Sequence, residues 1–190
     1  MKKLVCLLST VGLFTLGSFA VPVWGADLAS KDKDFVKEAA NGGMMEVALG
    51  EMAQTMAQSD DVKKFGSLMV TDHGKANEEL KKVAQQKKVS LPTKLDRKAK
   101  STEKKLKKHS GADFDKAYMQ EMVKDHAKDV AEFRYAEKNV QDPDLNAWVK
   151  STLPTLEQHL QMAKTTAQKL GIDVTKLEQE GTKEGEKKHK

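Results

Sequence analysis

Apolar residues recur along this chain at alternating spacings of three and four, which is the period of amphipathic α-helices. Four segments have this period, and no segment shows the sustained alternation that is typical of strands. The pattern predicts helices over about 32–58, 60–88, 112–140 and 143–170. Ser59, Pro143 and Gly171 fit these boundaries, because Ser caps a helix, Pro is tolerated in a first turn and Gly ends a helix.

The connections between the predicted helices differ in length. The first and third are short turns, whereas residues 89–111 form a long lysine-rich connection that we expect to be partly helical. A bundle with one long crossover has the ferritin-like connectivity. We therefore predict an all-α, ferritin-like four-helix bundle over 32–171, with one long crossover between helices 2 and 3. Residues 180–190 have no apolar anchor and are predicted to be a disordered Lys/Glu-rich tail.

The N-terminal 25 residues have the organisation of a secretory signal peptide: two lysines, an apolar run over 4–20 and then small residues. We expect cleavage after Gly25, or after Ala20 as the alternative, and hence a periplasmic or secreted protein. In another interpretation the apolar run stays as a membrane anchor, because it is just long enough to span. The single cysteine, Cys6, lies within this segment, so the mature chain would contain no disulfide.

Each apolar stripe is interrupted by one strongly polar residue. These residues are Glu46, His73, His126 and His159, and each lies near the middle of its predicted helix. Antiparallel helices of similar length meet at their midpoints, so the four side chains are expected to converge inside the bundle. Imidazole and carboxylate groups bind divalent transition metals. The pattern therefore predicts a site for one ion of Zn, Cu, Mn or Fe.

Two aspartates accompany the predicted site. Asp72 and Asp125 precede histidines in the near-repeated segments MVTDH and MVKDH, and each lies one position off the apolar stripe. Metal-bound histidines usually donate their second ring N–H to a carboxylate or carbonyl group. We therefore predict that both aspartates form the second shell of the site.

Several residues of the pattern have a second interpretation. A single core histidine is more often a hydrogen-bonded structural residue than a ligand, and Glu46 would face solvent if the stripe that begins at Val36 were the buried one. Methionines such as Met69 and Met122 favour Cu(I), although Met at helical spacing usually only fills a core. Pro154 either kinks the fourth helix or marks a later helix start.

Composition limits the classes of partner. The chain has 190 residues and a formal net charge of +5, but only Arg97 and Arg134 are arginines. Because Arg is the commonest reader of base edges, we do not expect nucleic acid as a partner. The lysine-rich crossover and tail allow weak contact with anionic envelope surfaces. No nucleophile or acid–base pair stands out, so an enzyme is not favoured, and the sequence leaves the oligomeric state open.

Four segments of this chain resemble the DUF4142 family of exported bacterial proteins, which belongs to the ferritin-like superfamily. The segments are FVKEAANGGMMEVALGEMA, FGSLMVTDHGKANEELKKVA, FDKAYMQEMVKDHAKDVAEF and LPTLEQHLQMAK. The resemblance implies a four-helix bundle. It also implies a shared pattern of residues: Glu46, Asp72, His73, His126, Pro154 and His159.

The sequence differs from the wider superfamily in one motif. Ferritin-like di-iron enzymes carry a Glu-x-x-His pair on two helices, but here Val70, Val123 and Leu156 stand three residues before the histidines. A single-metal site is therefore expected, with a role in metal buffering or envelope stress protection. The alternative function is a non-catalytic structural or interaction module of the cell envelope, with an inert buried polar cluster.

Overall fold

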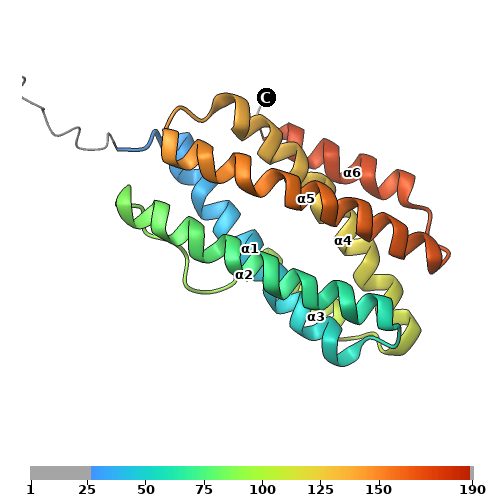
Figure 1. The fold of residues 1–190 in the computed structure, drawn as a ribbon. Coiled ribbons are helices and arrows are strands. Elements are labelled where there is room, and N and C mark those ends of the chain that lie inside the picture. Colours follow the sequence, from blue (N-terminus) through green and yellow to red (C-terminus); the bar gives the residue numbers. More distant parts are fainter. Residues whose placement is uncertain (1–26, 189–190) are drawn as a thin grey trace, which may run out of the picture.

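The computed structural model describes residues 27–188, and over this range the chain is all-helical (Figure 1). The predicted boundaries of the four long helices agree with the structure to within two residues, and the crossover contains a short helix as expected. The signal peptide predicted for residues 1–25 lies outside the described residues. The helices are α1 (Ser30–Met56), α2 (Asp60–Gln86), α3 (Arg97–Leu106), α4 (Gly111–Asn139), α5 (Pro143–Lys169) and α6 (Val174–Lys187).

The long helices pack in pairs along the chain. Helix α1 packs along α2, α4 packs along α5, and α2 meets α5 across the interior (Figure 1). Helix α6 lies along the opposite side of α4, and the short α3 touches both α1 and α4. The interior between α1, α2, α4 and α5 is therefore the place where side chains from distant segments meet.

The apolar core consists of two separate clusters. In α2, Phe65 and Met69 belong to the first cluster, whereas Leu80 belongs to the second. In α5, Ala163 belongs to the first cluster and Leu156 to the second. The histidines of these helices lie between the cluster residues in both cases. A layer of buried polar side chains thus divides the core across its middle.

Glycines set the close approach of α1 and α2. A Cβ atom on Gly50 would lie 2.6 Å from the carbonyl oxygen of Gly66, and a Cβ atom on Gly66 would lie 2.8 Å from that of Gly50. Real Cβ atoms do not approach carbonyl oxygens so closely, so larger residues here would push the helices apart. Both glycines are buried, and they fix the distance at which α1 faces α2.

Buried charges fix the ends of the helices. The Asp115 carboxylate of α4 accepts hydrogen bonds from the backbone N–H groups of Gln58 (3.0 Å) and Ser59 (2.8 Å), in the turn between α1 and α2. The Nζ atom of Lys87, after the end of α2, lies 2.7 Å from carboxylate oxygens of Asp142 and Asp144. These contacts hold the axial register of α2 against both α4 and α5.

Helix α5 continues through Pro154, so the alternative of a later helix start is wrong. Proline lacks the N–H group that would bond to the carbonyl of the previous turn. Just before it, the hydroxyls of Ser151 and Thr152 donate to the carbonyl oxygen of Trp148, at 2.9 and 2.8 Å. Such side-chain bonds to the preceding turn often accompany a bend in a helix.

The prediction of a disordered tail over 180–190 is wrong for the residues that the structure describes, because α6 extends to Lys187 and packs on α4. A Cβ atom on Gly181 would lie 2.1 Å from the Lys124 carbonyl oxygen, so only glycine permits this approach. Lys188 forms an ion pair of 2.9 Å with Glu132. The prediction failed because it required an apolar anchor within 180–190, whereas this part of α6 is held by glycines and charges.

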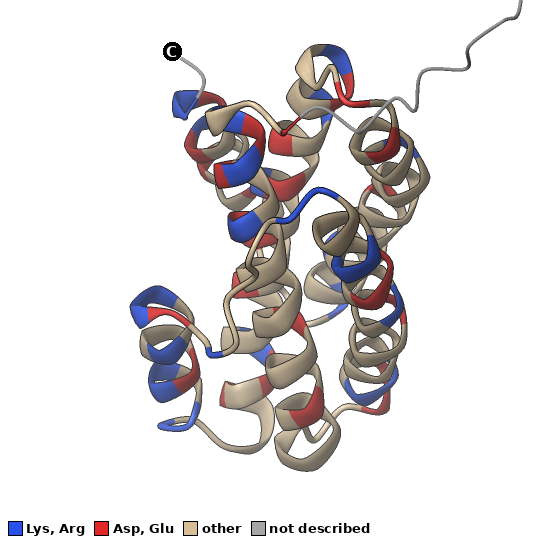
Figure 2. Cartoon of the chain, turned by 90° about the vertical axis from the view of Figure 1, so that its left-hand side faces the viewer, with Lys and Arg blue, Asp and Glu red and all other residues tan. Residues whose placement is uncertain are grey.

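Charged side chains cover the outside of the helices. Figure 2 shows that Lys and Arg alternate with Asp and Glu along them. Among the residues that the structure describes, no helix has the length and apolar character needed to cross a membrane.

Candidate metal centre

Three histidines from three helices meet in the polar layer. His73 of α2, His126 of α4 and His159 of α5 are buried, with exposed fractions of 6%, 0% and 1%. Each ring offers a nitrogen that lies within 4.8 Å of those of the other two. The ring centroids are separated by 5.3 to 5.6 Å. We call these three residues the histidine triad.

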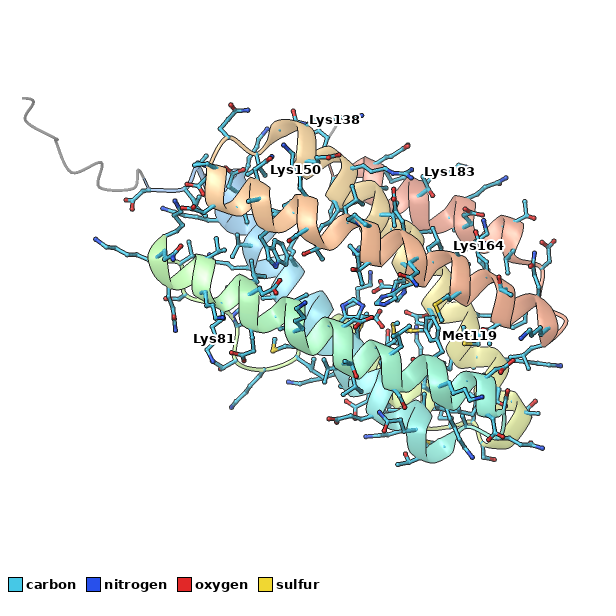
Figure 3. All side chains as sticks on the ribbon, in the orientation of Figure 1. Lys81, Met119, Lys138, Lys150, Lys164 and Lys183 are labelled. Atoms are coloured by element: carbon cyan, nitrogen blue, oxygen red, sulfur yellow. The ribbon has the colours of Figure 1, made fainter. Side chains whose placement is uncertain are left out.

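Figure 3 draws the side chains around this layer. Met119, which it labels, points into the interior between the helices and is fully buried, whereas the labelled Lys81 and Lys138 point outward. The Phe65 ring packs edge-on against two members of the triad, with centroid distances of 6.1 Å to His126 and 6.4 Å to His159. The triad is therefore enclosed by apolar groups on the side of the first core cluster.

Two members of the triad have one ring nitrogen tied to an acceptor. The Nδ1 atom of His126 lies 2.9 Å from the Met122 carbonyl oxygen, which can only accept, so Nδ1 carries the proton. The Nε2 atom of His159 lies 2.9 Å from Oδ2 of Asp72, and it donates to that carboxylate in the same way. The other nitrogen of each ring is then unprotonated in the neutral imidazole.

The remaining nitrogens have no partner among the described residues. Nε2 of His73, Nε2 of His126 and Nδ1 of His159 are buried without a hydrogen bond. A buried polar atom without a partner costs about 1–3 kcal/mol, so three in one place require an explanation. Ring nitrogens whose opposite N–H is held by a carbonyl or carboxylate have the arrangement of metal-bound histidines.

Burial keeps the triad uncharged. The pKa of His73 is lowered to about 3, mainly by desolvation and then by the neighbouring His126 and His159. Desolvation likewise lowers the pKa of His126 to about 4. The pKa of His159 is lowered by burial, although Asp72 opposes this shift. Neutral imidazole is the form that binds a metal ion, so the triad is in its ligand form at neutral pH.

Glu46, the fourth predicted ligand, is fully buried but does not belong to the three-nitrogen group. The rotation of α1 that would have exposed it is absent, although Val36 of the rival stripe is buried too. The Glu46 carboxyl group forms no hydrogen bond of good geometry among the described residues, although the Asp125 carboxylate lies close enough to act on its pKa, and the Tyr118 hydroxyl is buried without a partner as well. Desolvation, followed by the charges of Asp125 and Asp129, raises the pKa of Glu46 well above its ordinary value.

Asp72 and Asp125, which were predicted to hold the imidazoles of the site, have different surroundings. Asp72 holds His159 from the neighbouring helix, as described above. Asp125 has no histidine among its hydrogen-bond partners in the described part of the chain. It lies instead among charges that include Asp129, and burial together with Asp129 raises its pKa to about 6. The side chain of Asp125 is therefore part of a carboxylate group with Glu46 rather than a support for the triad.

Sequence reasoning missed two residues of the site. Asp129 lies one turn after His126, and its charge acts on both His73 and His126 by raising their pKa values. It forms an ion pair of 2.8 Å with Lys128. The carbonyl of Met122 was also missed, because a pattern of side chains does not show which backbone carbonyl groups accept hydrogen bonds. Asp129 could have been found by examining positions one turn after each histidine as well as before it.

Comparison with known families matched residues 24–166 to the family described as "Domain of unknown function (DUF4142)", which is most of the chain. The chain belongs to the DUF4142 family. The match covers α1, α2, α3 and α4 completely and nearly all of α5, so this DUF4142 domain contains the whole histidine triad. No curated protein and no solved structure matched the chain.

Proposed function

We propose that this DUF4142 protein binds one divalent transition-metal ion through His73, His126 and His159, and that it serves metal buffering or stress protection in the cell envelope. The observation that carries the proposal is the meeting of three buried imidazoles, each of which offers a nitrogen within 4.8 Å of the other two and has a buried ring nitrogen without a partner. One ion at their centre would satisfy all three. Export rests on the signal-like segment 1–25, and the ferritin-like arrangement of α1, α2, α4 and α5 is part of the same proposal.

The geometry fits an ion after a small closure of the rings. Tetrahedral coordination with metal–nitrogen bonds of about 2.0–2.1 Å separates two ligand nitrogens by about 3.4 Å. The nitrogens of the triad lie within 4.8 Å of one another, so the rings would move together by at most about 1.4 Å. Rotations about the side-chain torsions are sufficient for this movement. Three imidazoles suit Zn, Cu and Fe better than Mn, which prefers oxygen ligands.

Glu46 contributes negative charge within the same polar layer. A divalent ion held by three neutral imidazoles keeps its full charge in a region of low dielectric constant. A buried carboxylate whose pKa is raised when no cation is present loses its proton more readily when one binds nearby. Because Glu46 lies outside the three-nitrogen group, its role in this proposal is to balance charge, and the fourth ligand position expected for it from the sequence stays a prediction.

Metal analysis of the protein purified from its own compartment tests the proposal. About one equivalent of Zn, Cu or Fe is expected, and the metal should raise the melting temperature of the metal-free protein. If the protein holds no metal and none of Zn, Cu, Mn or Fe changes its melting temperature, the triad is an inert polar cluster. The alternative of a structural envelope module would then be favoured.

Variants of the triad locate the ion. A ligand that binds only the folded state adds about 2.7 kcal/mol at a concentration one hundred times its Kd. His73→Ala, His126→Ala and His159→Ala should each lose most of this metal-dependent gain in the free energy of unfolding. His109→Ala is the control, because His109 is exposed and lies in the crossover. Equal losses with and without metal in the three variants would contradict the proposed site.

A further inference from the structure

One side of the histidine triad opens into a groove between α2 and α5. We propose that a small anion enters this groove and binds the metal ion at the coordination position that the three histidines leave free. This inference rests on the proposed function, since it requires an ion at the triad. It makes the centre an exchangeable site, in which three protein ligands leave one position for an external molecule, rather than a closed structural site.

The groove has a volume of about 780 Å³ and reaches the triad directly. His73 and His159 both line it, together with Asp72, which holds His159. His126 and Glu46 do not line the groove. An ion among the three rings would therefore be approached from the groove past His73 and His159.

The groove exists because α2 and α5 are the less closely packed pair. These helices touch less extensively than α1 with α2 or α4 with α5. The lining of the groove includes three small residues, Ala76 on α2 and Ala147 and Ser151 on α5. Two side-chain contacts bridge the seam: the Trp148 Nε1–H donates to the Ala76 carbonyl oxygen at 3.2 Å, and His159 Nε2 lies 2.9 Å from Oδ2 of Asp72.

Charge favours an anion as the external ligand. Three neutral imidazoles do not offset the charge of a divalent ion, and the Asp72 carboxylate is already engaged with His159. Lys75 and Lys82 lie along the groove, but Glu79 and Asp144 lie there as well, so its rim is mixed in charge. The positive charge of the metal ion at the bottom of the groove, rather than the charge of the rim, therefore selects an anion. The ligand class is a small anion with one donor atom, such as an inorganic anion or a short carboxylate.

The experiment uses the Co²⁺-loaded protein and azide as the probe anion. Azide binding to Co²⁺ is followed through the visible absorption spectrum, which changes when a ligand joins the ion. Thr155→Trp places a large side chain in the groove, one turn before His159. Thr165→Trp is the matched control, because Thr165 is an exposed residue of the same helix that does not line the groove. Thr155→Trp should weaken azide binding at least tenfold without loss of Co²⁺, whereas Thr165→Trp should not weaken it.

Each result separates this inference from the proposed function. A protein that binds no Co²⁺ and whose melting temperature responds to none of Zn, Cu, Mn or Fe overturns both. Bound Co²⁺ whose spectrum does not respond to azide overturns the exchangeable position alone, and a response gained only in Glu46→Gln would show that Glu46 closes the site. If Thr155→Trp binds azide as tightly as the unmodified protein, the groove is not the route. Weakened azide binding in Thr155→Trp alone supports the inference.

Discussion

Replacement of Glu46 by Gln should change how the stability of the metal-free protein depends on pH. Glu46 is fully buried, and its pKa is raised well above the ordinary value of 4.5, first by desolvation and then by the charges of Asp125 and Asp129. The folded protein thus keeps a proton on this carboxyl group that the unfolded chain releases above about pH 4.5. Stability associated with Glu46 is present below that pH and is lost as the pH rises towards the pKa of the folded state.

The magnitude follows from the linkage of proton binding to folding. One proton bound in the folded state but not in the unfolded state lowers the free energy of unfolding by about 1.4 kcal/mol per pH unit. Between pH 5 and pH 7 the loss approaches about 2.7 kcal/mol if the group stays protonated in the fold. A glutamine amide at this position would keep the shape of the side chain without the titration. Between these two pH values, the Glu46→Gln variant should therefore gain stability relative to the unmodified protein by up to this amount.

Urea unfolding at pH 5, 6 and 7, with a chelator present, measures the effect. The other shifted groups contribute too: Asp125 acts in the same direction as Glu46, whereas His73 and His126 act in the opposite direction because their pKa values are lowered. Subtracting the curve of the variant from that of the unmodified protein removes the shared contributions of His73 and His126, and the difference reports the titration of Glu46 together with its effect on Asp125. Glu51→Gln, at an exposed position of the same helix, controls for the loss of one carboxylate. Parallel curves for Glu46→Gln and the unmodified protein would refute the reasoning.

Further predictions concern the packing of the helices. Gly181→Ala should lower stability by about 1–3 kcal/mol and expose α6 to limited proteolysis, because its Cβ would meet the Lys124 carbonyl oxygen at 2.1 Å. Gly74→Ala, with nothing within 4 Å of its Cβ, should instead raise the melting temperature slightly, by about 0.5–1 kcal/mol of stability. Asp115→Ala should cost about 2–4 kcal/mol in urea unfolding, because the turn between α1 and α2 loses two hydrogen bonds to a carboxylate. An equal loss in the exposed Asp113→Ala would contradict that account.

The helices were predictable because their signals are local. Period, caps and turn residues, such as Ser59 and Pro143, all lie within the segments that they shape, and the structure places these helix boundaries close to the predicted ones. The meeting of His73, His126 and His159 was also predictable, since similar helix lengths bring their midpoints to one height. The second half of helix α6 was not predictable, because its contacts with α4 use Gly181 and ion pairs, which produce no periodic pattern of apolar residues.

The position of Glu46 shows what a linear pattern leaves out. Its height along α1 agrees with that of the histidines, and its burial was expected from the stripe. The direction of its side chain depends on how α1 is rotated and how closely α1 approaches α2, which is set by the tight contact between Gly50 and Gly66. The direction of the Asp125 side chain was unpredictable for the same reason, because a residue one position off an apolar stripe can face either neighbouring helix. The position of a residue along its helix can be predicted from the sequence, but the rotation of the helix about its own axis is known only from the packed structure.

The cost of the polar layer bears on the choice between a metal site and an inert cluster. Three ring nitrogens and the Glu46 carboxylate are buried without partners, at about 1–3 kcal/mol each, against a typical net stability of about 5–15 kcal/mol for a folded domain. Apolar side chains of similar volume would join the two core clusters into one and remove that cost. If the layer had only a structural role, replacing its polar side chains by apolar ones would make the protein more stable. This cost supports the proposed metal site, in which one ion would satisfy the ring nitrogens and favour ionisation of the Glu46 carboxyl group.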